Sequence, residues 1–271
     1  MEPLNLAVLL VMGTAAGAIN AAVGSGSLLT LPVLLALGIP PGVAVRTNTV
    51  GILFSTIGST LGYRREIARE QQHLGPLVLV TMGCATLGSL LLLVSPPAAL
   101  DVLVPALIVV ALAMVVFQKP LTAAIRRRQD RRAARRAEAD GAGTTRERSP
   151  YRSPALIGAM GAASVYGGYF TAAQGILYLG VLGALTGRTM GSVNSVKNLL
   201  SLVVNLAAAL VYVLAYVVIG AEIVWIATAA IAIGALLGGY FGAHLAKRMP
   251  EWLLRGVIVA VALFALVRQF V

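Results

Sequence analysis

Long apolar runs closed by short turns fill most of this 271-residue sequence, and they restrict the fold more than any other feature. Hydrophobic residues make up 58% of the chain and charged residues 11%, whereas a soluble domain is about half apolar and a quarter charged. One span needs about 20 apolar residues, so the chain has room for about eight transmembrane segments, within a range of roughly seven to ten. We therefore expect an all-α, polytopic integral membrane protein.

Glycine-rich sequence interrupts two of the apolar runs, at Ala22–Ser27 and at Tyr166–Gly175. These interruptions predict broken or re-entrant helices, whose free N–H groups and positive dipole ends attract anions near the middle of a membrane. The alternative is that the glycines only allow helices to cross closely. The polar residues at the two breaks are candidate substrate contacts: Asn20, Ser25, Tyr169 and Gln174.

A polar stripe runs along the apolar segment Val193–Asn205, with the sequence VNSVKNLLSLVVN. Its polar residues are spaced at i, i+3, i+4, i+7 and i+11, which places them on one face of a helix. Such a face is costly to expose to lipid, so it is expected to line a protein interior or a hydrated cavity. One ammonium among amides and a hydroxyl favours a small anion or a polar solute. The stripe consists of Asn194, Lys197, Asn198, Ser201 and Asn205.

An alternative for Lys197 is snorkelling, because the segment from 189 to 219 is longer than the about 20 residues of a span. Arg46 and Arg188 are the other cations within or beside apolar runs, and both follow turn-like sequence. We interpret these two arginines as interfacial anchors.

Carboxylates are absent from the middle of every apolar run, because all ten acids lie in termini, loops or segment ends. This distribution argues against a carboxylate proton relay, a cation site and general acid–base catalysis. Cys84 is the single cysteine, and the two histidines are far apart in sequence, so we expect no metal site and no cofactor. The sequence does not predict an enzyme, and no catalytic residue is assigned.

The net charge of +11 is concentrated in residues 119–153, which hold eleven Lys/Arg and four acids. In a membrane protein such a segment is typical of a cytoplasmic loop that contacts anionic lipid, and we prefer this to nucleic-acid binding. Residues 64–75 and 244–251 are also basic and are expected to be cytoplasmic. The turns at 95–101 and 219–223 should then lie outside a cytoplasmic (inner) membrane that the chain crosses several times.

This orientation makes residues 155–219 cross the membrane an odd number of times. If residues 1–63 follow the same plan, the chain consists of two inverted repeats, a first half (1–118) and a second half (154–271), joined by the loop 119–153. A self-comparison supports this weakly, because Asn48, Ser55 and Ser59 recur as Asn194, Ser201 and Asn205 at an offset of 146. In this register Gly51 occupies the place of Lys197.

The broken runs resemble a known family. GAINAAVGSGSLLTLPVLLALGIPP and NTVGILFSTIGSTLGYRRE resemble the first half of the sulfite exporter TauE/SafE family. YGGYFTAAQGILYLGVLGAL and NSVKNLLSLVVN resemble its second half, and HLAKRMPEWLLRGVIVAVAL is similar to its last turn and helix. The resemblance covers nearly the whole chain except 119–153. It implies a multi-pass inner-membrane transporter for sulfite, organic sulfonates or carboxylates.

Together these features predict a transporter that moves a small anion by alternating access. Lys197 would supply the counter-charge and the amides beside it would bind the solute, while Asn48, Ser55 and Ser59 would face them from the other half. Two alternatives remain: a transporter of a neutral or zwitterionic solute with a structural Lys197, and a membrane scaffold that uses 119–153 for docking. The sequence is compatible with a homo-oligomer.

Overall fold

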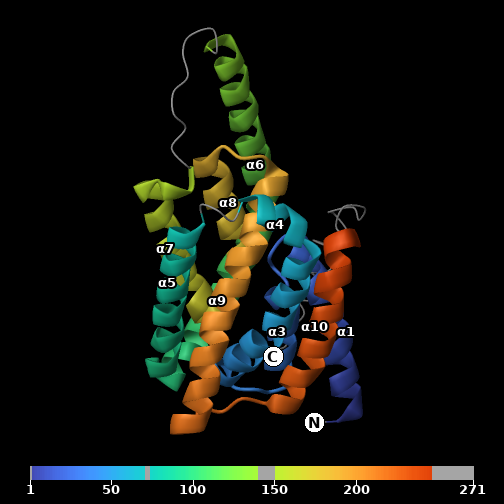
Figure 1. The fold of residues 1–271 in the computed structure, drawn as a ribbon. Helices are drawn as coiled ribbons and strands as arrows, with labels where there is room; N and C mark the ends of the chain where they lie inside the picture. The colour runs from blue at the N-terminus through green and yellow to red at the C-terminus, as the bar shows by residue number, and fades with distance from the viewer. Residues whose placement is uncertain (1, 71–73, 140–149, 246–271) are drawn as a thin grey trace.

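The computed structural model describes residues 2–70, 74–139 and 150–245, and every regular element in them is a helix (Figure 1). The predicted last segment, Leu253–Phe270, and most of the basic turn at 244–251 lie outside these residues. In chain order the elements are α1 (Pro3–Ala22), α2 (Ser27–Ala36), α3 (Pro41–Gly62), α4 (Arg64–Glu70), α5 (Gly75–Val94), α6 (Pro97–Ala139), η2 (Pro150–Arg152), α7 (Pro154–Phe170), α8 (Gln174–Thr186), α9 (Met190–Ile219) and α10 (Trp225–Leu245).

Local sequence signals explain where these helices begin and end. Five of the α-helices, α1, α3, α5, α6 and α7, carry proline in the first turn, where the missing N–H costs nothing. At the start of α9, Thr189 caps the helix by accepting a hydrogen bond from the N–H of Ser192 at 3.5 Å. At its end, Gly220 adopts a positive φ of 69°, which allows the chain to leave the helix.

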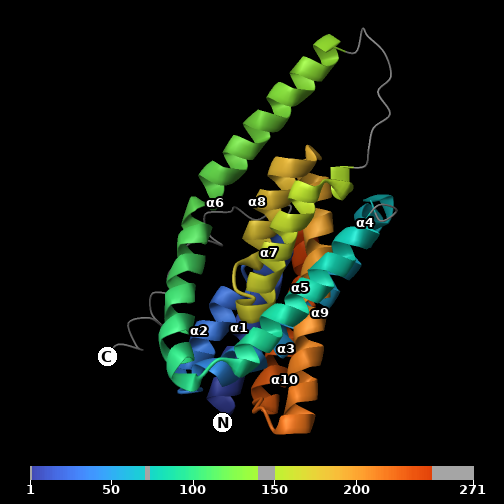
Figure 2. The ribbon, with the colours of Figure 1, turned by 90° about the vertical axis from the view of Figure 1, so that its left-hand side faces the viewer.

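Two helical hairpins enter the bundle from opposite ends. The chain reverses between α1 and α2, so that a Cβ at Gly26 would lie 2.2 Å from the Ala16 carbonyl oxygen of α1. It reverses again between α7 and α8, where the hydroxyls of Ser164 and Tyr178 meet at 2.7 Å across the turn. In Figures 1 and 2 the α1–α2 hairpin starts at the end that carries the N-terminus, and the α7–α8 hairpin starts at the end that carries α4. The structure confirms the two predicted helix breaks.

The two hairpins are each covered by a helix from the other part of the chain. Helix α5 packs on α7 and α9, whereas α10 packs on α1 and α3. The α1–α10 crossing is close enough that a Cβ at Gly238 would lie 1.9 Å from the carbonyl oxygen of Thr14. The small-residue run Gly234–Ala243 therefore allows the tight helix contact that its composition predicts.

Helix α6 continues far beyond its apolar part. It runs without a break through Pro120 to Ala139, and its basic end projects away from the bundle (Figure 2). The sequence predicts a basic loop over 119–153, and residues 119–139 of this segment are helical and continue α6. A proline removes one backbone hydrogen bond, and the Ala/Arg-rich sequence that follows has high helix propensity.

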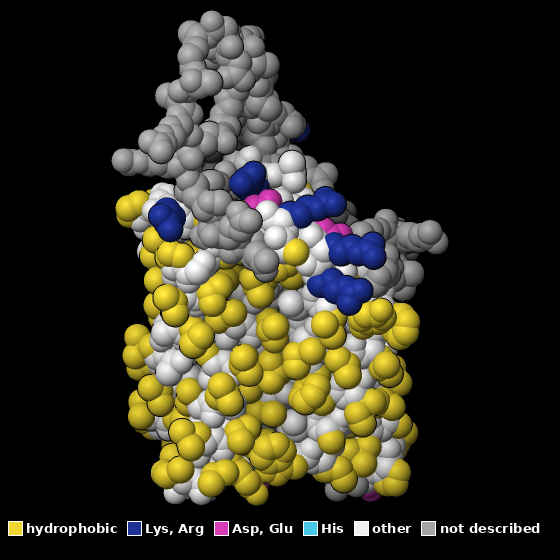
Figure 3. Space-filling model, viewed as in Figure 1, with side chains coloured by type: hydrophobic (Ala, Val, Ile, Leu, Met, Phe, Trp, Pro, Cys, Tyr) yellow, Lys and Arg dark blue, Asp and Glu magenta, His cyan; other side chains and the backbone are white. Residues whose placement is uncertain are grey.

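The surface has the two-part character of a membrane protein. On the face shown in Figure 3, hydrophobic side chains cover the body and basic side chains gather at the end near α4. Exposed arginines of this end include Arg64, Arg65, Arg69, Arg152 and Arg188. Within the described residues, five helices are long and apolar enough to cross a membrane: α1, α5, the 97–118 part of α6, α9 and α10 up to Ala243. The chain is thus an integral, multi-pass membrane protein.

Candidate functional site

The two helix breaks touch each other inside the bundle. The N–H of Gly175, in the first turn of α8, donates to the carbonyl oxygen of Gly24 at 3.1 Å. A Cβ built on either glycine would lie 2.4 Å from the Cα of the other, so neither position has room for a side chain. Gly24 also has a φ of +83°, which favours glycine. The breaks therefore form one central crossing, where irregular backbone from both hairpins is enclosed by helices.

The α7–α8 break has an unusual backbone. Thr171 and Ala173 adopt φ values of 60° and 59°, in the left-handed region that non-glycine residues rarely occupy. The hydroxyl of Tyr166 donates to the Ala172 carbonyl at 2.8 Å, and the hydroxyl of Thr171 meets that of Thr49 at 3.0 Å. Contacts from α7 and α3 thus hold the break in a conformation that costs about 1 kcal/mol or more per residue.

Lys197 lies fully enclosed at the end of α1. Its Nζ donates to the carbonyl oxygens of Asn20 at 3.1 Å and Ala21 at 3.3 Å. These carbonyls belong to the last turn of α1, where the unpaired C=O groups form the negative end of the helix dipole. Its exposed fraction is 0%, so the lysine does not snorkel to an interface. The ammonium instead binds the first helix break from α9.

The other residues of the predicted α9 stripe line up beside Lys197. Asn198 is buried, and its Nδ2 donates to the Ala21 carbonyl at 3.3 Å and to the Asn194 carbonyl at 3.0 Å. Ser201 and Asn205 are buried one and two turns further along, and Asn205 Nδ2 donates to the Ser201 carbonyl at 2.8 Å. The structure therefore brings all five stripe residues onto a face that packs against other helices, with Asn194 half-buried at its end.

Several polar atoms of this region have no hydrogen-bond partner among the described residues, although each is buried. Interior polar groups are normally paired, so buried atoms without a partner call for an explanation such as a bound ligand or an ordered water. The orphaned atoms at predicted site residues are Asn194 Oδ1, Ser201 Oγ, Asn205 Oδ1, Ser25 Oγ, Gln174 Oε1 and Asn48 Nδ2.

Helix α3 contributes one of its three predicted residues directly. Ser55 accepts a hydrogen bond at 3.1 Å from Asn20 Nδ2, so Asn20 joins α3 to the backbone position that binds Lys197. Asn48 is buried but pairs through its Oδ1 with Thr30 of α2, and Ser59 bonds to the Thr56 carbonyl of its own helix. We therefore place Ser55 beside Lys197, while Asn48 and Ser59 are not joined to it by a contact.

Of the two predicted residues at the second break, one lies at the central crossing and the other does not. Gln174 is buried in the first turn of α8, next to Gly175 and the central crossing. Tyr169 points elsewhere, because its hydroxyl meets that of Ser95 at 3.2 Å at the end of α5. The role of Tyr169 in the site stays a prediction, and the structure gives it no contact with the α9 stripe.

The sequence analysis missed two features of this region. It did not select the α1 carbonyls, which are backbone atoms with no sequence signal. It also did not select the Thr49–Thr171 hydroxyl pair, which joins α3 to the second break. The signal that could have identified this pair is the presence of a threonine in the second break and another in the middle of an apolar segment.

Polar contacts also connect the elements at both ends of the bundle. At the basic end, the carboxylate of Glu70 accepts hydrogen bonds from the hydroxyls of Tyr151 at 2.9 Å and Ser192 at 2.8 Å, and it lies 3.7 Å from Arg188 Nε. Burial is the main reason why the pKa of Tyr151 is raised to about 12. At the other end, Arg46 Nε of α3 donates at 3.0 Å to the Glu222 carbonyl in the α9–α10 connection.

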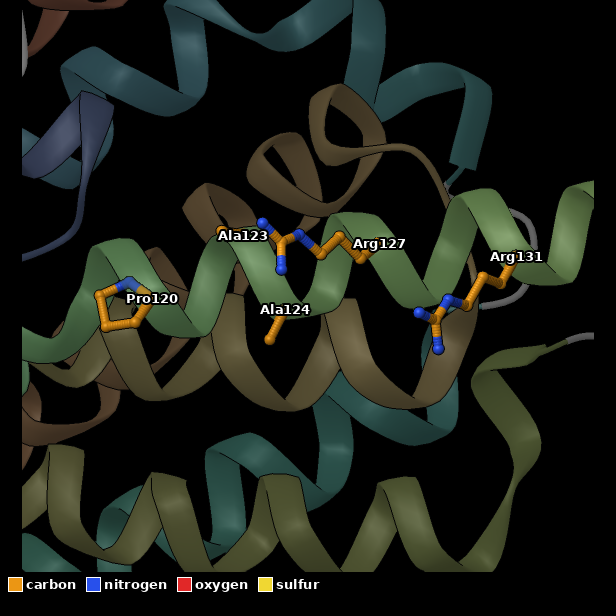
Figure 4. Close-up of a pocket in the computed structure, with 5 residues that line it drawn as sticks. All are labelled: Pro120, Ala123, Ala124, Arg127 and Arg131. Carbon is orange, nitrogen blue, oxygen red and sulfur yellow. The ribbon is translucent and has the colours of Figure 1, made fainter.

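A pocket of about 450 Å³ lies elsewhere, on the basic part of α6. Figure 4 shows its lining residues along one stretch of that helix, with Arg127 and Arg131 successive turns apart. None of its lining residues belongs to the polar set around Lys197. We therefore do not identify it with the functional site.

The fold and the site define a class of protein. A multi-pass helical bundle with two broken-helix hairpins and a buried polar centre is the architecture of a membrane transporter. A sequence profile described as sulfite exporter TauE/SafE matches residues 9–268. The chain belongs to this family, and it is a membrane transporter and not an enzyme.

Curated relatives agree with this membership. The chain is 25% identical over 264 residues to the probable membrane transporter protein YfcA of Escherichia coli strain K12, covering 97% of this chain and 88% of the relative. A probable membrane transporter protein, ORF9, of Sinorhizobium sp. is 34% identical over 115 residues, covering 42% of this chain and 44% of the relative. Another from Haemophilus influenzae is 31% identical over 87 residues, covering 32% of this chain and 34% of the relative. No solved structure matches the chain.

Proposed function

We propose that this protein is a secondary transporter that moves a small anion of the sulfite, organosulfonate or small carboxylate type across the cytoplasmic membrane by alternating access. Lys197 is the principal anion-binding group, and the remaining α9 stripe residues, with Asn20, Ser25, Ser55 and Gln174, line the path. The observation that carries the proposal is the buried ammonium at a helix break, on a helix face where Ser201 Oγ and Asn205 Oδ1 are buried without a hydrogen-bond partner among the described residues.

The chemistry of Lys197 supports an anion. An ammonium has three N–H donors, and two of them bind the Asn20 and Ala21 carbonyls. The third has no partner in the described part of the chain, so a bound oxyanion can accept it without displacing protein contacts. A positive charge enclosed by helices is costly unless it is neutralised, and an anionic substrate supplies the missing charge.

The arrangement of the elements supports alternating access. The order helix, break, short helix, long helix occurs in α1–α2–α3 and again in α7–α8–α9. The two sets start from opposite ends of the molecule in Figure 1, and we propose that they are inverted repeats whose relative tilting opens the centre to each side in turn. The basic end, with α4 and the α6 extension, then faces the cytoplasm and contacts anionic lipid.

The proposal is tested by flux into proteoliposomes that contain the purified full-length protein. Labelled sulfite, methanesulfonate and a small monocarboxylate are compared with a neutral and a zwitterionic analogue of similar size. We expect saturable flux of at least one anion and its loss in Lys197→Ala. Arg64→Ala, which removes an exposed positive charge of α4, is the matched control and should keep full flux.

The same measurement separates the alternatives. The contacts of Lys197 with the α1 carbonyls are also compatible with a purely structural role. If Lys197→Ala folds and keeps full anion flux, Lys197 does not bind the substrate. Flux of only the neutral or zwitterionic analogue would replace the anion by another solute class. Thermal unfolding of each variant in detergent shows whether a loss of flux reflects a loss of folded protein.

A further inference from the structure

Among the described residues, the interior holds one side chain, Lys197, that can offer a positive charge to a bound substrate. Lys197 is fully buried, whereas every other lysine or arginine whose side chain is described is half-buried or exposed. The described acids lie at helix ends, in α4, in the α9–α10 connection or on the basic extension of α6. In a medium of low dielectric constant, charges must be matched nearly one to one, because an unmatched buried charge is very costly.

Hydrogen-bond donors near Lys197 are equally limited. The ammonium has one unspent N–H, and Ser201 lies one turn along the same face of α9 with a hydroxyl that is buried and orphaned. The carbonyls of Asn20 and Ala21, which are adjacent, present negative partial charge. A substrate oxygen can therefore accept the lysine N–H, but a second negative charge at that place would face carbonyl oxygens.

The two short helices do not supply the missing charge. Several backbone N–H groups at or near their N-termini already donate to oxygens of the protein. In α8 the N–H of Gly175 binds the Gly24 carbonyl at 3.1 Å and that of Ile176 binds the Ala173 carbonyl at 3.0 Å. In α2 the N–H of Leu28 binds the Ser25 carbonyl at 3.1 Å. These N–H groups are therefore not available to a bound anion without the loss of a contact within the protein.

We propose that the site selects anions that carry a single negative charge, such as hydrogen sulfite, alkyl sulfonates or monocarboxylates, and discriminates against dianions of similar size. This inference rests on the proposed function and makes it more specific. A substrate that exists in both charge states is transported as its protonated, monovalent form. Sulfite flux at a fixed total concentration therefore rises as the pH falls, while flux of an anion with a fixed charge does not follow the same curve.

The test uses the full-length protein in proteoliposomes and pairs of anions that differ in charge. Methanesulfonate is compared with sulfate, and propionate with malonate, as substrates and as competitors of labelled methanesulfonate. We expect a preference of at least about 100-fold for the monoanion in each pair, which corresponds to two tenfold steps in affinity. The pH dependence of sulfite flux is measured beside that of methanesulfonate as the control of fixed charge.

Two substitutions at Ser201 test whether its hydroxyl and the charge next to Lys197 determine which anions bind. Ser201→Ala should weaken transport of both monoanions, whereas Ser195→Ala should not, because Ser195 Oγ donates to the Ser192 carbonyl of its own helix. Ser201→Lys adds a second positive charge one turn from Lys197 and should raise the competition by sulfate and malonate. If Ser201→Lys does not fold, the comparison of anion pairs in the unchanged protein still shows whether the site prefers monoanions.

The outcomes distinguish a failure of the charge selectivity from a failure of the proposed anion transport. Equal transport of monoanions and dianions, or a sulfite flux that rises with pH, would overturn the charge selectivity and leave the anion transporter standing. Absence of flux for every anion, with the protein folded, would overturn the proposed function itself.

Discussion

The Gly24 carbonyl oxygen and the Gly175 N–H form a hydrogen bond of 3.1 Å that joins the two helix breaks. The Cα atoms leave no space for a side chain on either residue, so this contact depends on both being glycine. It is also the point where the α1–α2 hairpin, which enters from one end, meets the α7–α8 hairpin from the other.

We predict that Gly24→Ala and Gly175→Ala each destabilise the protein by roughly 1–3 kcal/mol, because the added methyl group forces the breaks apart. Gly24→Ala should be the worse of the two, since alanine is also strained at its positive φ. Gly158→Ala is the matched control: no atom lies within 4 Å of its Cβ position, and alanine favours a helix. Thermal midpoints in detergent give the order, and a stable Gly24→Ala variant would contradict the contact.

Removing the Glu70 carboxylate should loosen the basic end. Glu70→Ala leaves the hydroxyls of Tyr151 and Ser192 without their acceptor, and we expect a loss of about 1–3 kcal/mol. Arg188→Ala should cost at most about 0.5 kcal/mol, because its side chain is 46% exposed and surface ion pairs contribute little. Equal losses for the two variants would mean that the contacts of Arg188, which include the Tyr151 ring, contribute as much to this end as the two hydroxyl contacts of Glu70.

Alkaline solution should reveal the buried phenol of Tyr151. Burial raises its pKa from 10.0 to about 12, so the folded state favours the protonated form. The sign follows from linkage: the associated stabilisation is complete below pH about 10 and is lost as the pH rises through about 12. The thermal midpoint of the unchanged protein should fall more steeply over this window than that of Tyr151→Phe. Parallel curves for the two proteins would argue against this assignment.

The orientation can be measured by cysteine labelling in a Cys84→Ala background. Ala124→Cys is exposed on the basic part of α6, and Ala98→Cys is exposed at the opposite end, where α6 begins. In intact cells a membrane-impermeant maleimide should label Ala98→Cys and spare Ala124→Cys. In inside-out vesicles the pattern should reverse. The opposite result would invert the topology and place the basic extension outside.

Much of the fold could be predicted because its signals are local. Glycine runs mark both breaks, and the spacing of Lys197, Asn198 and Ser201 identifies the buried face of α9 before any neighbour is known. The neighbour itself is not encoded in that spacing. Lys197 binds backbone carbonyls of α1, and backbone atoms are the same in every sequence. Such a contact depends on how two helices cross, which is a tertiary property.

In helix α6 a local sequence signal predicts a feature that the structure does not have. Proline at position 120 predicts an end, but a single lost hydrogen bond does not outweigh the helix propensity of the residues that follow it. Asn48 and Tyr169 were selected as polar residues near the correct segments. Their partners, Thr30 and Ser95, lie on other helices, and helix periodicity alone does not identify them.

The packing of α10 on α1 and α3, and of α5 on α7 and α9, has a consequence for biogenesis. Because α10 is the wall against which α1 and α3 pack, the segments that leave the ribosome first reach their final neighbour only when nearly the entire polypeptide has been inserted. In the folded protein Gly13 and Gly17 of α1 lie against the backbone of Ile231 and Ala235, so these glycines lack their neighbour until α10 is inserted. Two separately expressed fragments, cut within the basic extension, should each be degraded alone and rescue one another when they are made in the same cell.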